Sequence, residues 1–109
     1  MELDAHTLYV LRKHRDLTTL YGEAPAAVVT AIEGFNKQVA VAERALSGTN
    51  FLVGDHFTGA DVMMVTTLKW AQAYKIELAP RLIEYSALHT ARTAYRQAGR
   101  LNFSITAGA

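Results

Sequence analysis

The stretch that decides the fold is FLVGDHFTGADVMMVTTL, residues 51–68. A short loop containing Gly54 leads through Thr58 into a segment with no charged residue between Asp61 and Lys69. A helix that is apolar nearly all round is normally buried by other helices. The stretch therefore predicts a helix from Gly59 to about Tyr74 at the centre of a helical bundle.

The start of this helix carries two stabilising devices. With Thr58 at the N-cap, its hydroxyl can accept from the Asp61 N–H while the Asp61 carboxylate accepts from the Thr58 N–H, a capping box. Phe57 before the cap and Val62 five residues later are placed to form a hydrophobic staple. We interpret these four residues as structural and expect loss of the Thr58 cap to destabilise the fold by about 1 kcal/mol.

Apolar side chains at three- and four-residue steps predict four more helices. Their expected ranges are 3–21 (apolar stripe at 3, 10, 14, 17 and 21), 25–47, 78–88 and 91–101. Gly22 is a plausible C-terminal cap and Pro25 a favourable first residue of the next helix. Gly34 lies inside the second range, where it weakens the helix by roughly 1 kcal/mol or allows a neighbour to approach closely. No alternating strand pattern persists, so the prediction is an all-α bundle of about five helices in one domain, residues 1–109.

Composition excludes several classes of function. The 109 residues carry 11 basic and 10 acidic side chains, a net charge of +1, and no cysteine. We therefore expect no thiolate metal site and no nucleic acid partner, and we interpret Arg92, Arg96 and Arg100 as a solvated face. The four histidines have no metal-ligand spacing, so no metal is expected. The absence of a long apolar run predicts no membrane association, and together with the lack of a signal-like start it favours the cytoplasm.

Residues 52–61 resemble the signature Leu-x-Gly-Asp-x-Phe-Thr-x-Ala-Asp of glutathione S-transferases, which opens the central helix of their all-α C-terminal domain. Residues 68–78 and 85–102 are similar to the exit of that helix in bacterial, beta-like members and to the family's C-terminal motif. Residues 2–9 resemble the first helix of the domain, so the resemblance covers about residues 2–103. Leu88 stands where the family usually has Arg, and Thr93 where it has Pro, which alters the expected packing of the last helices.

The resemblance implies the following expectations. The chain corresponds to the helical domain alone, without the N-terminal thioredoxin-like domain that binds glutathione and activates its thiol. His6, Tyr9 and Trp70 match positions that line the pocket for a small electrophilic co-substrate, although Trp70 fits the core equally well. No catalytic residue and no cofactor lie within this chain, glutathione being the co-substrate when a thioredoxin-like domain is paired with it. A homodimer is also expected.

The resemblance leaves the role of the chain open. It suits the helical half of a glutathione-conjugating enzyme of detoxification. The isolated chain is then expected to be inactive. It also suits a stand-alone, non-catalytic module that binds other proteins, or a truncated reading frame. The sequence does not separate these readings and does not identify the co-substrate.

Overall fold

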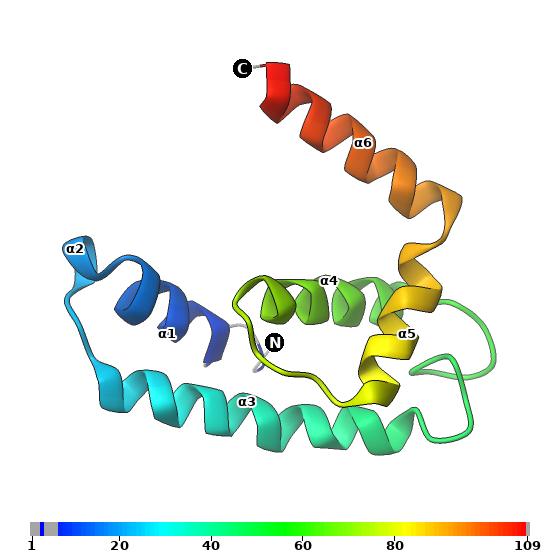
Figure 1. Ribbon diagram of the computed structural model, residues 1–109. Helices are drawn as coiled ribbons and strands as arrows, with labels where there is room; N and C mark the ends of the chain where they lie inside the picture. The colour runs from blue at the N-terminus through cyan, green and yellow to red at the C-terminus, as the bar shows by residue number, and fades with distance from the viewer. Residues whose placement is uncertain (1–2, 4–6, 109) are drawn as a thin grey trace.

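The computed structural model describes residue 3 and residues 7–108, with side chains as far as residue 102. The elements, in order, are α1 (Tyr9–Leu11), a π-helical stretch η2 (Arg12–Asp16), α2 (Thr18–Tyr21), α3 (Pro25–Ala45), α4 (Gly59–Ala73), α5 (Pro80–Thr90) and α6 (Thr93–Gly108) (Figure 1). The described residues contain no strand, so the all-α prediction is confirmed.

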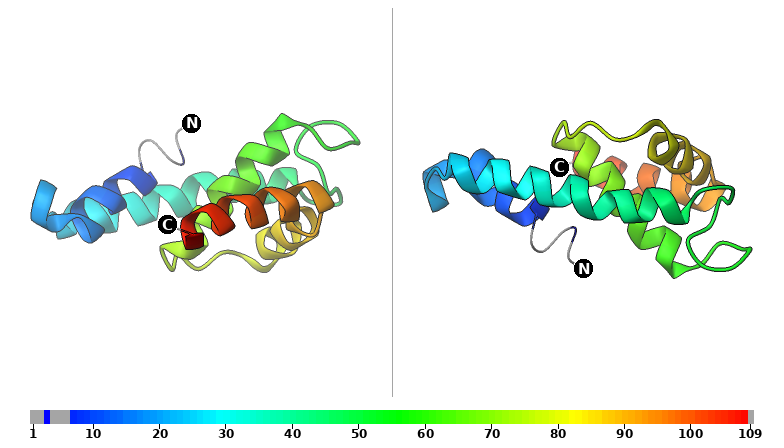
Figure 2. Two further views of the ribbon diagram at one scale, coloured as in Figure 1. Left: turned by 90° about the horizontal axis from the view of Figure 1, so that it is seen from above. Right: turned by 90° about the horizontal axis from the view of Figure 1, so that it is seen from below.

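The long helix α3 forms the base of the molecule. Pro25 starts it, where the missing N–H leaves no helical bond unmade. Buried residues recur along it at three- and four-residue steps, which places one continuous stripe against the core. The segments α1, η2 and α2 lie along the first half of α3, whereas α4 and α5 lie over its second half (Figures 1 and 2).

Fifteen of the described apolar residues are buried and form the core, and none of them comes from η2 or α2. They are Leu3, Leu8, Leu11, Phe35, Val39, Ala42, Leu46, Met64, Val65, Leu68, Ala71, Ile76, Leu78, Leu82 and Tyr85. The core thus lies between α1, α3, α4 and α5, with no described residue of α6 in it.

The single helix expected over residues 3–21 is wrong, because the structure divides it. The Leu17 N–H donates to the Arg12 carbonyl five residues back, at 2.9 Å, and Leu17 leaves the helical region with φ −114° and ψ 41°. A wider turn of this kind shifts the side chains out of phase with a 3.6-residue period. Among the residues described before α3, the buried ones are Leu3, Thr7, Leu8 and Leu11. Of the apolar stripe that we counted through residues 3, 10, 14, 17 and 21, only Leu3 is therefore buried.

The expected central position of α4 is also wrong. Met64, Val65 and Leu68 are buried, but Val62 is 51% exposed and Met63 is 54% exposed. On the side of Val62, the reason is that α6 begins next to α4 but does not pack along it. One face of α4 therefore belongs to the core and the other is open.

Helix α6 extends away from the other helices, as Figure 1 shows in orange and red. Its residues from Thr93 to Asn102 are all exposed except Gly99, which is partly buried. It begins two residues later than predicted and continues to Gly108. This projection raises the radius of gyration to 15.3 Å, against about 13 Å for a compact domain of this length.

Candidate functional site

Asp61 is the buried polar centre of the molecule and is 0% exposed. Its Oδ1 accepts from the Tyr85 hydroxyl at 2.6 Å and from the Leu52 N–H at 3.0 Å. Its Oδ2 accepts from the Thr58 N–H at 3.1 Å, which is the expected carboxylate half of the capping box. Asp61 thus joins the start of α4 to α5 and to the loop before α4.

The Thr58 half of the capping box is weaker than predicted. The Thr58 hydroxyl faces the Asp61 N–H in the capping-box arrangement. That N–H, however, donates to the Thr58 carbonyl oxygen at 3.0 Å, and the buried hydroxyl makes no hydrogen bond of good geometry. Because the Asp61 carboxylate makes the well-formed bonds, it contributes more than Thr58 to holding this helix start.

The surroundings of Asp61 favour its charged form. Burial opposes ionisation and is the largest single effect, but the hydrogen bonds from Tyr85, Leu52 and Thr58 together outweigh it. The pKa of Asp61 therefore lies below its ordinary value. Burial, the hydrogen bond to Asp61 and the charge of Asp61 all raise the pKa of Tyr85 far above its usual range, so Tyr85 stays a donor.

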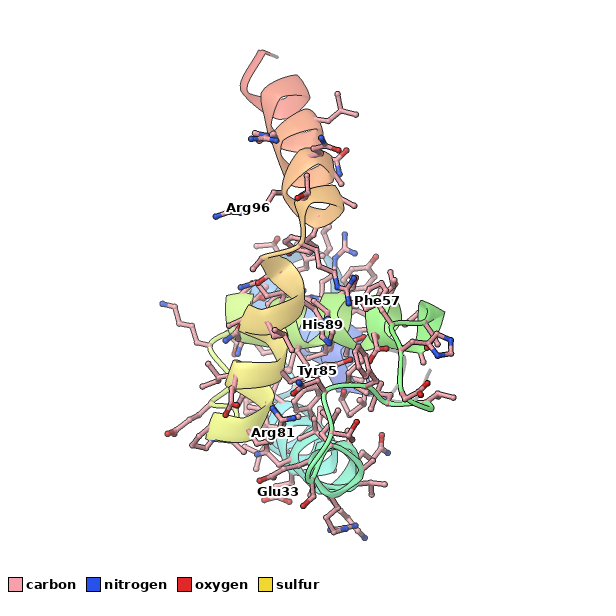
Figure 3. All side chains as sticks on the ribbon, turned by 90° about the vertical axis from the view of Figure 1, so that its right-hand side faces the viewer. Glu33, Phe57, Arg81, Tyr85, His89 and Arg96 are labelled. Atoms are coloured by element: carbon pink, nitrogen blue, oxygen red, sulfur yellow. The ribbon has the colours of Figure 1, made fainter. Side chains whose placement is uncertain are left out.

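One face of α5 holds the loop between α3 and α4. Arg81, Tyr85 and His89 are spaced four residues apart and lie in a row along the helix (Figure 3). The Arg81 guanidinium donates to the Leu46 carbonyl at 3.2 Å, to the Thr49 carbonyl and to the side-chain oxygen of Asn50 at 3.1 Å. This row was not among the predicted site residues, although its four-residue spacing is visible in the sequence.

His89 is buried at the end of the same row, and its hydrogen bonds define its tautomer. The Arg92 Nε–H donates to His89 Nδ1 at 3.2 Å, so Nδ1 accepts. Nε2 then carries the proton and donates to the Asn50 carbonyl at 2.8 Å. The rings of Phe51, Phe57 and Tyr85 lie 4.9–5.8 Å from the His89 ring, centroid to centroid.

Arg92, Arg96 and Arg100 are all exposed, as expected of a solvated face, but Arg92 also makes contacts within the protein. Its guanidinium carbon lies 3.8 Å from the centre of the Phe57 ring, in addition to the bond that its Nε makes to His89. Arg96, by contrast, points away from this cluster (Figure 3). Arg92 is therefore an exposed arginine whose guanidinium is held by Phe57 and His89.

A cavity of about 250 Å³ lies where α4, α5 and α6 meet. Its lining is mostly apolar and consists of Phe57, Val62, Val65, Thr66, His89, Arg92, Ala94, Tyr95 and Ala98. Phe57 and Val62, the two residues of the expected staple, thus border the same space.

The structure brings two of the three expected co-substrate residues together. The Tyr9 ring on α1 meets the Trp70 ring on α4 edge to face, with centroids 4.9 Å apart. Trp70 is partly buried, packs against the core and also contacts Tyr74 at 5.8 Å. The third residue, His6, lies outside the described residues.

The described part of the chain offers neither a metal site nor a membrane-spanning helix. No three His, Asp or Glu side chains there are grouped closely enough to hold a metal ion. None of its helices is both long and apolar enough to cross a membrane.

The fold and the Asp61 cluster define a class of protein: an all-α domain organised around a capped helix whose N3 aspartate anchors the neighbouring helix. The family model described as "Glutathione S-transferase, C-terminal domain" matches residues 2–96. The chain belongs to this family. No curated protein and no solved structure matches it significantly.

Proposed function

We propose that this chain is the helical half of a glutathione-conjugating enzyme and forms the apolar wall for a small electrophilic co-substrate. A thioredoxin-like domain, on the same or another polypeptide, supplies glutathione binding and activation of its thiol. The observation that carries the proposal is membership of the glutathione S-transferase family over residues 2–96. A cytoplasmic location and a homodimer belong to the same proposal.

Tyr9 and Trp70 are the co-substrate residues in this proposal. Their edge-to-face contact joins the first helix to α4 and provides two aromatic surfaces, the kind of lining that apolar ligands prefer. Tyr9 is 43% exposed and so remains available to a ligand, whereas Trp70 also supports the core. We assign His6 to the same wall on the basis of its position in the sequence.

Trp70 is the only tryptophan, so its fluorescence reports directly on this wall. Titration with 1-chloro-2,4-dinitrobenzene should quench Trp70 saturably, and Tyr9→Ala should weaken binding several-fold. Tyr21→Ala is the matched control, because Tyr21 is an exposed tyrosine on α2. If Tyr9→Ala and Tyr21→Ala bound the electrophile equally well, Tyr9 would not belong to the co-substrate wall.

The isolated chain should not catalyse conjugation. Added to glutathione and the same electrophile, it should leave the uncatalysed rate unchanged, since no described residue is placed to activate a thiol. A clear acceleration would contradict this part of the proposal.

An antibody against this domain distinguishes the proposal from its alternative, a stand-alone module that binds proteins. The open face of α4, with Val62 and Met63 exposed, favours the alternative. In source cells, a band larger than 12.0 kDa by a thioredoxin-like domain supports the enzyme. A band at 12 kDa, with no thioredoxin-like protein co-purifying, supports the module.

A further inference from the structure

The cavity at the junction of α4, α5 and α6 combines an apolar interior with one oriented cation. Five of its lining residues have side chains without a polar atom: Phe57, Val62, Val65, Ala94 and Ala98. Its volume of about 250 Å³ is close to the lower end of small-molecule sites, about 300 Å³. The space therefore suits a molecule of one or two fused rings.

Arg92 is held in a fixed orientation at this cavity. Its Nε donates to His89 Nδ1 at 3.2 Å, and the ring of Phe57 covers its guanidinium at 3.8 Å. These contacts use Nε and one face of the group and leave the terminal nitrogens for another acceptor. Within the part of the chain that the structure describes, no carboxylate forms an ion pair with Arg92.

The backbone at this place adds to the positive charge. Ala94 and Tyr95, in the first turn of the 16-residue helix α6, line the cavity. That first turn contains no acidic residue, and no acidic residue follows Glu84 in the sequence. The partial positive charge of the helix start and the guanidinium therefore favour an anion at the same point.

We propose that this cavity binds a small aromatic carboxylate. The flat ring occupies the apolar space against Val62, Val65 and Ala98, and the carboxylate accepts hydrogen bonds from the terminal nitrogens of Arg92. A planar guanidinium matches a carboxylate with two parallel bonds, which a neutral ligand of the same shape cannot form. This site goes beyond the proposed function, because neither Tyr9 nor Trp70 lines it.

The test uses 2-naphthoate as the probe and the uncharged, similarly shaped 2-naphthamide as its control, with the full 109-residue chain. Calorimetric titration should give one site that binds naphthoate at least tenfold more tightly than naphthamide. Arg92→Gln should weaken naphthoate binding tenfold or more. Arg96→Gln, which removes an arginine one turn along that does not line the cavity, should change it less than twofold.

A second variant tests the position of the ring. Ala98 is exposed on α6 and lines the cavity, so Ala98→Phe should fill the space and abolish binding, while circular dichroism shows an unchanged helix content. Full retention of binding by Ala98→Phe, or equal losses in the Arg92 and Arg96 variants, would overturn the proposal. Sedimentation that shows a dimer, converted to a monomer by Ala98→Phe, would assign the cavity to a second copy of the chain instead.

Discussion

At the scale of single residues, Asp61 determines most of what is specific about this fold. A carboxylate that is removed from water must be compensated by donors, and Asp61 has three of them: two backbone N–H groups and the Tyr85 hydroxyl. These donors come from the loop, from the helix start and from α5. Ionised Asp61 is therefore the point at which three segments are joined.

Tyr85→Phe should destabilise the chain by about 1.5–3 kcal/mol, the usual range for a hydrogen bond to a charged group. The ring is retained, so the loss reflects the 2.6 Å bond to Asp61. Urea unfolding followed by circular dichroism measures it. Tyr21→Phe, at an exposed tyrosine, is the control and should stay within about 0.5 kcal/mol of the parent chain. Equal effects would mean that the buried bond contributes nothing net.

Asp61 should also make stability depend on pH on the acid side. Its pKa is lowered in the folded chain, so its contribution is complete above the ordinary value of 3.8 and is lost as pH falls through the lower folded value. Asp61→Asn should therefore be much less stable than the parent chain at pH 7. The difference between their free energies of unfolding should become smaller below pH 3.8. Asp55→Asn, at an exposed aspartate, is the control and should stay within about 0.5 kcal/mol of the parent chain at pH 7. A constant difference for Asp61→Asn would contradict this assignment.

At the scale of elements, α3 contains a position where glycine is not needed. A Cβ built on Gly34 would have Thr7 Cγ2 as its nearest neighbour, at 3.7 Å, an ordinary contact. Gly34→Ala should stabilise the chain by about 0.5–1 kcal/mol, since alanine is the better helix former. Gly22→Ala should do the opposite by about 1–3 kcal/mol, because Gly22 ends α2 at φ 81°. Thermal unfolding compares the stabilities of the two variants. If Gly22→Ala were also stabilising, the backbone conformation at residue 22 would tolerate a side chain without strain.

The link between α5 and the preceding loop depends on Arg81. Arg81→Met keeps the aliphatic stem but removes the bonds to the Leu46 and Thr49 carbonyls and to Asn50, so we expect a loss of about 1–3 kcal/mol. Faster proteolysis within residues 46–58 should accompany it. Glu84→Gln removes only the exposed ion pair of Arg81, at 3.6 Å, and should cost less than about 1 kcal/mol. If Glu84→Gln were as damaging, the ion pair and not the carbonyl bonds would hold the loop.

At the scale of the whole molecule, α6 is the part with the least support. Its described side chains are exposed, and none belongs to the core. Amide hydrogens of α6 should therefore exchange faster than those of α4, because local opening there exposes little apolar surface. Hydrogen exchange read by mass spectrometry measures this in the full chain. Protection of α6 equal to that of α4 would show that α6 is covered in solution.

Features that depend on neighbouring residues could be predicted from the sequence, whereas contacts between distant segments could not. Helix ranges, the capping box and the family follow from residues close together in the chain, because periodicity and caps act within one or two turns. Positions 25 and 59 accordingly lie at helix starts in the structure, as Pro25 and the Thr58 cap indicated, whereas α5 starts at Pro80, two residues after the expected start. The π-helical stretch is an exception, since the sequence shows no breaker between residues 12 and 16.

The sequence by itself thus determined the all-α class, most of the helices and the family of this protein. Only the tertiary structure decided which face of α4 is covered and that Arg92 contacts Phe57. It also decided that Tyr85 bonds to Asp61 at the start of α4, 24 residues away, and that His89 bonds to Asn50 in the loop, 39 residues away. The physical reason is that the face of a helix is buried only if another helix packs against it. The sequence of an apolar helix is the same in either case. Hydrogen bonds between distant segments likewise depend on how the helices pack, which no local pattern contains.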